Sequence, residues 1–157
     1  VLSQVVDGTC CDDLAVSTSV PVRSVARPGH RPRVLVAEDN PVNRKVVSRI
    51  LDRLGCNVRL VVDGKEAVAA VVDEDFDVVF MDCQMPVMDG YEATRRIRQA
   101  ELRGGRRVPV VALTANALAG DREKCLDAGM DDYLSKPVQR RDMESMLVRW
   151  VQGAPVA

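Results

Sequence analysis

The sequence contains few aromatic residues and almost no histidine. Phe, Tyr and Trp make up 3% of its 157 residues, and the single histidine, His30, lies in a Pro-Gly-His-Arg-Pro stretch that is a poor setting for a metal ligand. The five cysteines are odd in number and show no metal-like spacing, so we expect reduced, mostly buried thiols rather than a disulfide framework or a zinc site. They are Cys10, Cys11, Cys56, Cys83 and Cys125. Cys83, next to Asp82, is interpreted as a packing residue, since small buried thiols commonly pack in cores; a redox-active thiol is the disfavoured alternative.

Long apolar runs are also absent. None approaches the ~20 residues needed to cross a bilayer, and residues 1–30 lack the basic start and apolar centre of a secretory signal. We therefore expect no membrane contact by this segment and a cytoplasmic location, although a parent protein could be membrane-anchored. A net charge of −1 gives no general reason to expect nucleic acid as a partner. The first residue is Val rather than Met, which suggests a piece of a longer protein.

The length allows one domain with a core large enough to be stable alone. Residues 1–32 show little periodicity and are rich in Ser, Thr, Pro, Gly and Asp, so we interpret them as a linker or disordered segment. The folded domain is predicted over residues 33–152, and residues 153–157 are a tail.

Short apolar runs alternate with helical patterns through the predicted domain. The runs predict strands at 34–37, 57–62, 78–82, 108–113 and 132–135, and the patterns predict helices at 41–54, 64–73, 90–102, 118–128 and 139–152. Connections this short favour right-handed crossovers between parallel strands. The predicted fold class is therefore α/β, an open parallel sheet with helices on both faces.

Polar residues follow several of the predicted strands. Asp82 ends the apolar run at 78–82, just before a loop that Pro86 and Asp89-Gly90 interrupt. An acid at one strand end is more often a cap or turn former than a functional group. In open parallel sheets, however, ligands bind beyond the carboxyl ends of the strands. This chain places Glu38, Asp39, Asp82, Thr114 and Lys136 there.

Three carboxylates at one sheet edge repel one another unless a cation lies among them. Oxygen ligands without His or Cys indicate Mg²⁺. Lys136 adds a positive charge and Thr114 a hydroxyl donor, which together predict a pocket for a phosphoryl group beside a carboxylate nucleophile. A structural salt bridge is the alternative role for Lys136.

Four stretches carry a resemblance to a known family. They are Glu38-Asp39-Asn40-Pro41-Val42-Asn43, Met81-Asp82-Cys83-Gln84-Met85-Pro86-Val87-Met88-Asp89-Gly90, Leu113-Thr114-Ala115-Asn116 and Leu134-Ser135-Lys136-Pro137. Over about residues 33–150 the chain resembles the receiver domain of two-component signalling, most closely the receivers of hybrid sensor histidine kinases. The resemblance implies a flavodoxin-like, doubly wound (βα)5 fold with strand order 2-1-3-4-5.

The resemblance also implies roles at matching positions. Asp82 would be the phosphoacceptor, taking a phosphoryl group from a phosphohistidine. Asp39 and Asp82 would hold Mg²⁺ together with the backbone carbonyl of Gln84, while Glu38 would act through water. The first acid is Asp in many stand-alone receivers, and the longer Glu38 suits an indirect metal contact. Gln84 and Asn116 occupy positions that tune hydrolysis, so the phosphate lifetime is open.

Lys136, Thr114 and Tyr133 would report the phosphorylation state. Lys136 would pair with Asp82 and then with its phosphoryl oxygen, Thr114 would move to bond that oxygen, and Tyr133 would follow inward. The Lys136-Pro137 bond is cis in this family, a geometry that is accessible mainly before proline. The face built by residues 108–113, 118–128, 132–135 and 139–152 would switch between two states, and its part at 118–128, 132–135 and 139–152 could form a weak homodimer.

The implied partners are a histidine kinase, a histidine phosphotransfer protein, or both. A hybrid sensor histidine kinase is the preferred parent; the alternatives are a stand-alone response regulator and a degenerate receiver that only binds protein. The receiver itself would catalyse only its own phosphorylation and dephosphorylation. Flavodoxins are disfavoured because Glu38-Asp39 would repel a bound phosphate, and haloacid-dehalogenase-type phosphatases because Gln84 cannot act as general acid.

A basic stretch on and after the predicted helix at 90–102 is interpreted as a solvated face. No interleaved aromatic residues accompany it, which argues against a nucleic-acid site. The stretch comprises Arg95, Arg96, Arg98, Arg103, Arg106 and Arg107.

Overall fold

The computed structural model describes residues 31–104, 106–115 and 119–152. Most of the predicted N-terminal linker, with Cys10, Cys11 and His30, lies outside the described residues. Asn116 and the predicted tail at 153–157 also lie outside them.

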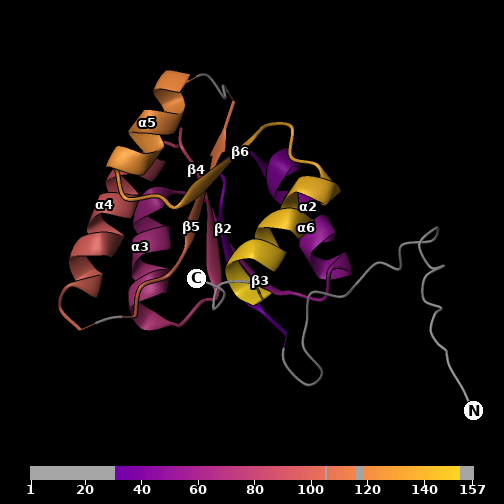
Figure 1. The fold of residues 1–157 in the computed structure, drawn as a ribbon, viewed down its shortest axis with the longest axis horizontal. Helices are drawn as coiled ribbons and strands as arrows, with labels where there is room; N and C mark the ends of the chain where they lie inside the picture. The colour runs from indigo at the N-terminus through magenta and orange to yellow at the C-terminus, as the bar shows by residue number, and fades with distance from the viewer. Residues whose placement is uncertain (1–30, 105, 116–118, 153–157) are drawn as a thin grey trace, which may run out of the picture.

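Five parallel strands form one sheet, in the order β3-β2-β4-β5-β6 (Figure 1). Numbered along the chain, this is the order 2-1-3-4-5, so the predicted fold is confirmed. β2, β4 and β5 occupy the middle of the sheet, and their side chains are almost all buried, as expected for strands covered on both faces. The strands are β2 (Arg33–Ala37), β3 (Asn57–Val61), β4 (Val78–Asp82), β5 (Val110–Thr114) and β6 (Asp132–Ser135).

Helices cover both faces of the sheet (Figure 1). On one face lie α2 (Pro41–Arg53) and α6 (Arg140–Leu147), which continues as a π-helix over Val148–Gln152; on the other lie α3 (Gly64–Asp73), α4 (Gly90–Glu101) and α5 (Ala119–Asp127). Each layer has its own buried cluster. Leu51 and Met143 pack in the first and Ala93 and Ile97 in the second.

Side-chain caps begin the helices that follow the first strands. Asn40 Oδ1 accepts from the N–H of Val42, and Pro41 opens α2 at a position where no N–H is needed. The Asp63 carboxylate caps α3, and the Asp89 carboxylate caps α4. Each cap fixes the residue at which a loop at the carboxyl edge of the sheet ends and the next helix begins.

Element bounds differ from the prediction mainly at the fourth strand. β5 begins at Val110 rather than Val108, because the pairing with β4 begins at Val110 opposite Val79 and the preceding Pro109 has no N–H to donate. β5 also ends one residue later than predicted, at Thr114, whereas β4 ends at Asp82 as predicted. α5 is described from Ala119, one residue later than predicted.

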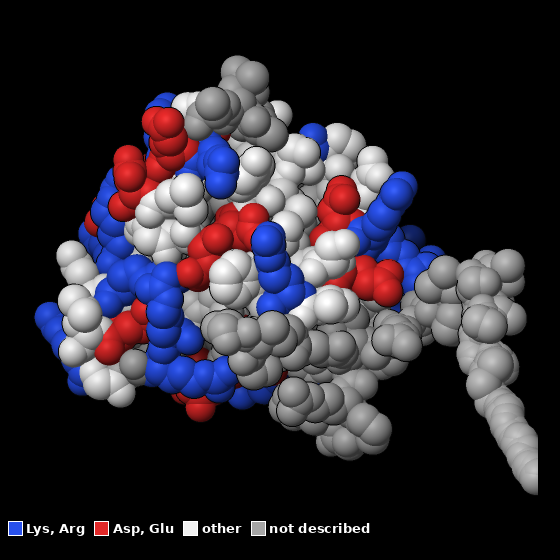
Figure 2. Space-filling view, in the orientation of Figure 1, with Lys and Arg blue, Asp and Glu red and all other residues white. Residues whose placement is uncertain are grey.

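The interpretation of the basic stretch was wrong for one residue. Arg98 is only 14% exposed, and it donates to the carboxylates of Glu101 and Asp131 and to the carbonyls of Val108 and Gly129. The rest of the face mixes both charges, as Figure 2 shows at the left of the molecule. Arg95 and Arg96, for example, pair with Glu92.

None of the helices in the described part of the chain combines the length and the apolar character that crossing a membrane requires.

Candidate functional site

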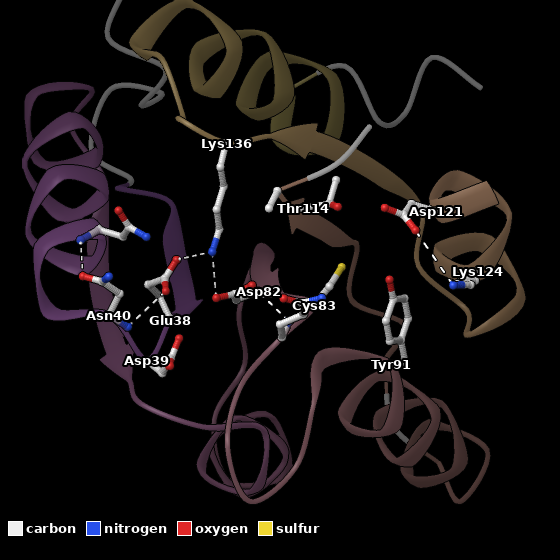
Figure 3. Close-up of a pocket in the computed structure, with 13 residues that line it drawn as sticks. Glu38, Asp39, Asn40, Asp82, Cys83, Tyr91, Thr114, Asp121, Lys124 and Lys136 are labelled. Atoms are coloured by element: carbon white, nitrogen blue, oxygen red, sulfur yellow. Dashed lines mark hydrogen bonds and ion pairs between the residues drawn. The ribbon is translucent and has the colours of Figure 1, made fainter. Parts of the chain in front are cut away.

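A cleft of about 290 Å³ opens at the carboxyl edge of the sheet, between the ends of β2, β4 and β5. It contains all five residues that the sequence placed at this edge, Glu38, Asp39, Asp82, Thr114 and Lys136 (Figure 3). The strand order turns back at β2, which has β3 on one side and β4 on the other, so the cleft lies where open α/β folds bind ligands. Its wall includes Glu38, Asp39, Asn40, Asn43, Asp82, Cys83, Gln84, Tyr91, Thr114, Ala115, Asp121, Lys124 and Lys136.

Asp82 lies at the base of this cleft and is 3% exposed. Its Oδ2 accepts a hydrogen bond from Lys136 Nζ at 2.8 Å, and its Oδ1 accepts one from the backbone N–H of Gln84 at 3.1 Å. Two donors from different elements therefore hold the carboxylate in one orientation while it still faces the cleft.

Lys136 reaches two acids at once. Its Nζ lies 2.9 Å from Glu38 Oε2 as well as 2.8 Å from Asp82 Oδ2. Burial alone would lower the pKa of Lys136, but the hydrogen bonds and charges of Asp82 and Glu38 raise it above its usual value. The ammonium group therefore stays charged. The Lys136-Pro137 peptide is cis, as the resemblance implies.

The loop after β2 holds the other two acids in place. Glu38 is buried, and its Oε1 accepts a hydrogen bond from the N–H of Asn40 at 3.1 Å. Asp39 is exposed to solvent at the mouth of the cleft. Arg44, from the first turns of α2, donates to the backbone carbonyls of both Glu38 and Asp39, at 2.9 and 2.8 Å. Arg44 thus positions the acidic loop without entering the cleft wall.

The three acids fit a hard divalent cation. One carboxylate oxygen from each of Glu38, Asp39 and Asp82 lies within 4.8 Å of the others. Glu38 Oε2 is buried and makes no hydrogen bond within the described part of the chain, although it lies in ion-pair range of Lys136. Oxygen donors of this kind suit Mg²⁺, which keeps several waters and uses few protein carboxylates.

Glycine is required where the loop after β4 packs closely. A Cβ on Gly90 would lie 2.2 Å from the carbonyl oxygen of Asp82, and one on Gly64 would lie 2.5 Å from the carbonyl oxygen of Met88. The Gly90 N–H donates to the carbonyl of Cys83, which fastens the start of α4 against the end of β4. The Asp89-Gly90 turn therefore sets the position of the phosphoacceptor candidate as well as the start of a helix.

The predicted switch residues lie in different places. Thr114 is buried in the cleft wall at the end of β5, and its carbonyl accepts from the N–H of Lys136. Tyr133 is not part of the cleft wall; it is half-buried and packs against the core cluster on the α3, α4 and α5 side. Tyr91, which the sequence reasoning missed, lines the cleft instead. Its position in the first turn of α4, directly after Asp89-Gly90, was the sequence feature that could have predicted a place near the cleft.

Buried thiols line one side of the same region. Burial raises the pKa of Cys83 to about 12, and burial also raises the pKa of Cys125 above its usual value. Both thiols are therefore neutral at physiological pH.

The response regulator receiver domain model matches residues 34–148. The chain belongs to the response regulator receiver family. Among curated proteins it is 44% identical over 120 residues to the sensor histidine kinase GacS of Pseudomonas protegens, covering 76% of this chain and 13% of that protein. It is 38% identical over 149 residues to histidine kinase 1 of Arabidopsis thaliana, covering 74% and 12%. The chain thus spans about an eighth of the length of these relatives.

Solved receiver structures share the fold. The receiver domain of the sensor histidine kinase PA1611 from Pseudomonas aeruginosa, which has a magnesium ion in its active-site cleft, is 52% identical with a TM-score of 0.72, over 78% of this chain and 98% of that one. The receiver of Saccharomyces cerevisiae Ssk1, crystallised with the histidine phosphotransfer protein Ypd1, matches at 33% identity with a TM-score of 0.73, over 77% and 89%. The resemblance to receivers of hybrid histidine kinases is therefore confirmed.

Proposed function

We propose that this domain is a phosphorelay receiver in which Asp82 takes a phosphoryl group from a phosphohistidine. The observation that carries the proposal is the Asp82 carboxylate, fixed by Lys136 and the Gln84 N–H at the base of a cleft that also holds Glu38 and Asp39. A carboxylate oxygen of Asp82 forms a bond to phosphorus as the phosphorus–nitrogen bond of the donor breaks. The electron pair of that bond returns to the imidazole of the donor.

The residues of the chain supply positioning and charge for this transfer. Lys136 neutralises a phosphoryl oxygen, and the Thr114 hydroxyl donates to another. Glu38, Asp39, Asp82 and the backbone carbonyl of Gln84 would hold Mg²⁺, with Glu38 acting through water. When bound, the ion neutralises negative charge on the transferring group. The magnesium ion in the P. aeruginosa receiver supports this assignment.

Phosphorylation changes the positions of residues in and near the cleft wall, and these movements carry the signal. Thr114 draws toward the phosphoryl group, and Tyr133 follows inward beside it, which shifts the face formed by β5, α5, β6 and α6. A weak homodimer through α5, β6 and α6 stays a prediction.

The proposed donor is a histidine-bearing phosphotransfer domain that docks on α2. Val42 and Val46 on this helix are 67% and 45% exposed. Val46 also lines a groove of about 100 Å³ with Pro137 and Val138, beside Lys136. A donor must cover the mouth of the cleft to deliver its phosphoryl group, and this apolar surface borders that mouth. The Ssk1 receiver, crystallised with a histidine phosphotransfer protein, supports this kind of partner.

We further propose that the domain is part of a hybrid sensor histidine kinase and works in the cytoplasm. The similarity to GacS and to the Arabidopsis histidine kinase supports this parent. A stand-alone response regulator is the alternative.

The test is uptake of phosphate from a small phosphodonor such as acetyl phosphate in the presence of Mg²⁺. Intact-mass spectrometry is expected to show one added phosphoryl group on the wild type, labile to hydroxylamine as an acyl phosphate is. Asp82→Asn is expected to show none, while Asp73→Asn, at an exposed acid at the end of α3, behaves as wild type. A wild type that takes up no phosphate would favour a degenerate receiver, and an Asp82→Asn variant that still takes it up would show that Asp82 is not the acceptor.

A further inference from the structure

Two cysteines lie in contact beside the cleft. Cys83 Sγ and Cys125 Sγ are 3.8 Å apart although the residues are 42 positions apart in the sequence, and both are free and buried. A disulfide bond is ~2.05 Å long, so the sulfurs must approach each other by roughly 1.8 Å to form one. Closing this gap requires rotation of the two side chains and a small shift of one element.

The pair joins the phosphoacceptor strand to α5. Cys83 directly follows Asp82, and its N–H donates to the carbonyl of Leu113 in the neighbouring strand. Of the α5 side chains that the structure describes, residues 120–127, only Cys125 is buried. The Cys125 thiol therefore attaches this helix to the core, and it contacts both the Cys83 thiol and the Tyr91 side chain.

We propose that Cys83 and Cys125 are a reversible oxidation site, converted by a peroxide to a disulfide that fastens α5 to the end of β4. One sulfur attacks a peroxide oxygen, which gives a sulfenic acid and, with hydrogen peroxide, one water. The second sulfur displaces the hydroxyl as another water and forms the S–S bond. The thiols lose two electrons and two protons in total, and a dithiol reductant restores them.

The surroundings of the pair favour a small oxidant. Cys83 lines the 290 Å³ cleft, where Figure 3 shows its sulfur, so a molecule the size of hydrogen peroxide can reach it. Both residues are at most 3% exposed, which excludes direct attack on a bulky disulfide such as oxidised glutathione. Because both thiols are buried, peroxide reaches them slowly, and the reaction is expected under sustained exposure to peroxide. The adjacent second thiol captures the sulfenic acid before further oxidation.

Fastening α5 bears on signalling, and this consequence rests on the proposed phosphoacceptor function. The helix begins a few residues after Thr114, and its Asp121 and Lys124 form part of the cleft wall. A covalent tie to β4 restrains the face that is proposed to shift on phosphorylation. The experiments below need no phosphodonor, so they test the oxidation site independently of that function.

The first experiment maps the cross-link. The full chain carrying Cys10→Ser and Cys11→Ser, two positions outside the described residues, is reduced, treated with hydrogen peroxide, alkylated and digested with trypsin. The expected product is one disulfide-linked pair of peptides that contain Cys83 and Cys125, lost after dithiothreitol. Cys56→Ser, at a thiol buried in the other core cluster, leaves this product unchanged. Sulfinic acid at either residue, or no linked pair, overturns the proposal.

The second experiment measures what the bond does. In hydrogen-exchange mass spectrometry, peptides from α5 are expected to exchange several-fold more slowly in the oxidised than in the reduced protein, while peptides from α2 are unchanged. Cys83→Ala and Cys125→Ala are both measured. Each variant alone is expected to abolish the difference in α5 exchange between oxidised and reduced protein, so the test stands even if one variant destabilises the fold. Equal exchange of α5 in the two redox states, with the cross-link formed, overturns the claim that the bond fastens the helix.

Discussion

Replacing Asp39 by asparagine is expected to stabilise the protein without magnesium and to remove its stabilisation by magnesium. Asp39, Glu38 and Asp82 each place a carboxylate oxygen within 4.8 Å of the others. Two unit charges at that distance repel by about 0.9 kcal/mol in water and by about 3.5 kcal/mol at an effective dielectric constant near 20. Because Asp39 is exposed, the lower value applies, and removing its charge is expected to raise the free energy of unfolding by about 1 kcal/mol.

Magnesium is expected to make the wild type more stable than the Asp39→Asn variant, the reverse of their order without the ion. A ligand that binds only the folded state at 100 times its dissociation constant adds about 2.7 kcal/mol of stability. For a domain of this size that gain corresponds to a rise in Tm on the order of 10 °C. The asparagine variant loses one of the carboxylates that hold the ion, so its rise is expected to be small. The two curves of Tm against magnesium concentration should therefore cross.

The measurement is thermal unfolding followed by circular dichroism, at constant ionic strength, from metal-free buffer to saturating MgCl₂. Asp73→Asn serves as the control because it removes an exposed acid far along the chain, at the end of α3. It is expected to follow the wild type at every magnesium concentration. If the Asp39→Asn and wild-type proteins gain equally from magnesium, or if neither gains, the three acids do not form the metal site.

Three further substitutions test how the site is supported. Arg98→Ala leaves the carboxylates of Glu101 and Asp131 without their buried partner, so urea denaturation should show a loss of about 3 kcal/mol; a loss below 1 kcal/mol would contradict this. Arg44→Ala frees the carbonyls of Glu38 and Asp39, and magnesium titration should give affinity about 10-fold weaker with little change in metal-free stability. Gly90→Ala forces a Cβ against the Asp82 carbonyl, which should lower stability by about 1–3 kcal/mol in the same denaturation assay; unchanged stability would show that the loop can yield.

The sequence predicted the fold because its local patterns agree with one another. Apolar runs, caps such as Asn40 and Asp89, and terminators such as Gly55 mark every strand and helix within about two residues. The candidate site followed from the same reasoning, since parallel strands bring their carboxyl ends to one edge. Glu38, Asp82 and Lys136 therefore meet although nearly 100 residues separate the first from the last.

Contacts that depend on tertiary packing were not predictable in this way. Arg98 lies in the same basic stretch as the exposed Arg95 and Arg96, and its contacts with the Gly129 carbonyl and the Asp131 carboxylate, in the loop after α5, leave its side chain only 14% exposed. The sequence likewise could not show that Tyr91, rather than Tyr133, lines the cleft, because that also depends on tertiary packing. The contact between the Cys83 and Cys125 thiols likewise depends on how α5 packs, which no local periodicity encodes.

The charges at the cleft indicate that Lys136 alone would not balance the negative charge of the proposed transfer. Three carboxylates and one ammonium leave the group with a net charge of −2. Converting the Asp82 carboxylate to an acyl phosphate changes the net charge from −2 to −3. With a divalent cation bound, the net charge would be 0 before phosphorylation and −1 after it. Asp82 and Glu38 are at most 3% exposed, so solvent screens these charges poorly. The electrostatic energy gained from the cation is therefore large. We therefore expect phosphorylation and magnesium binding to be coupled, with each strengthening the other.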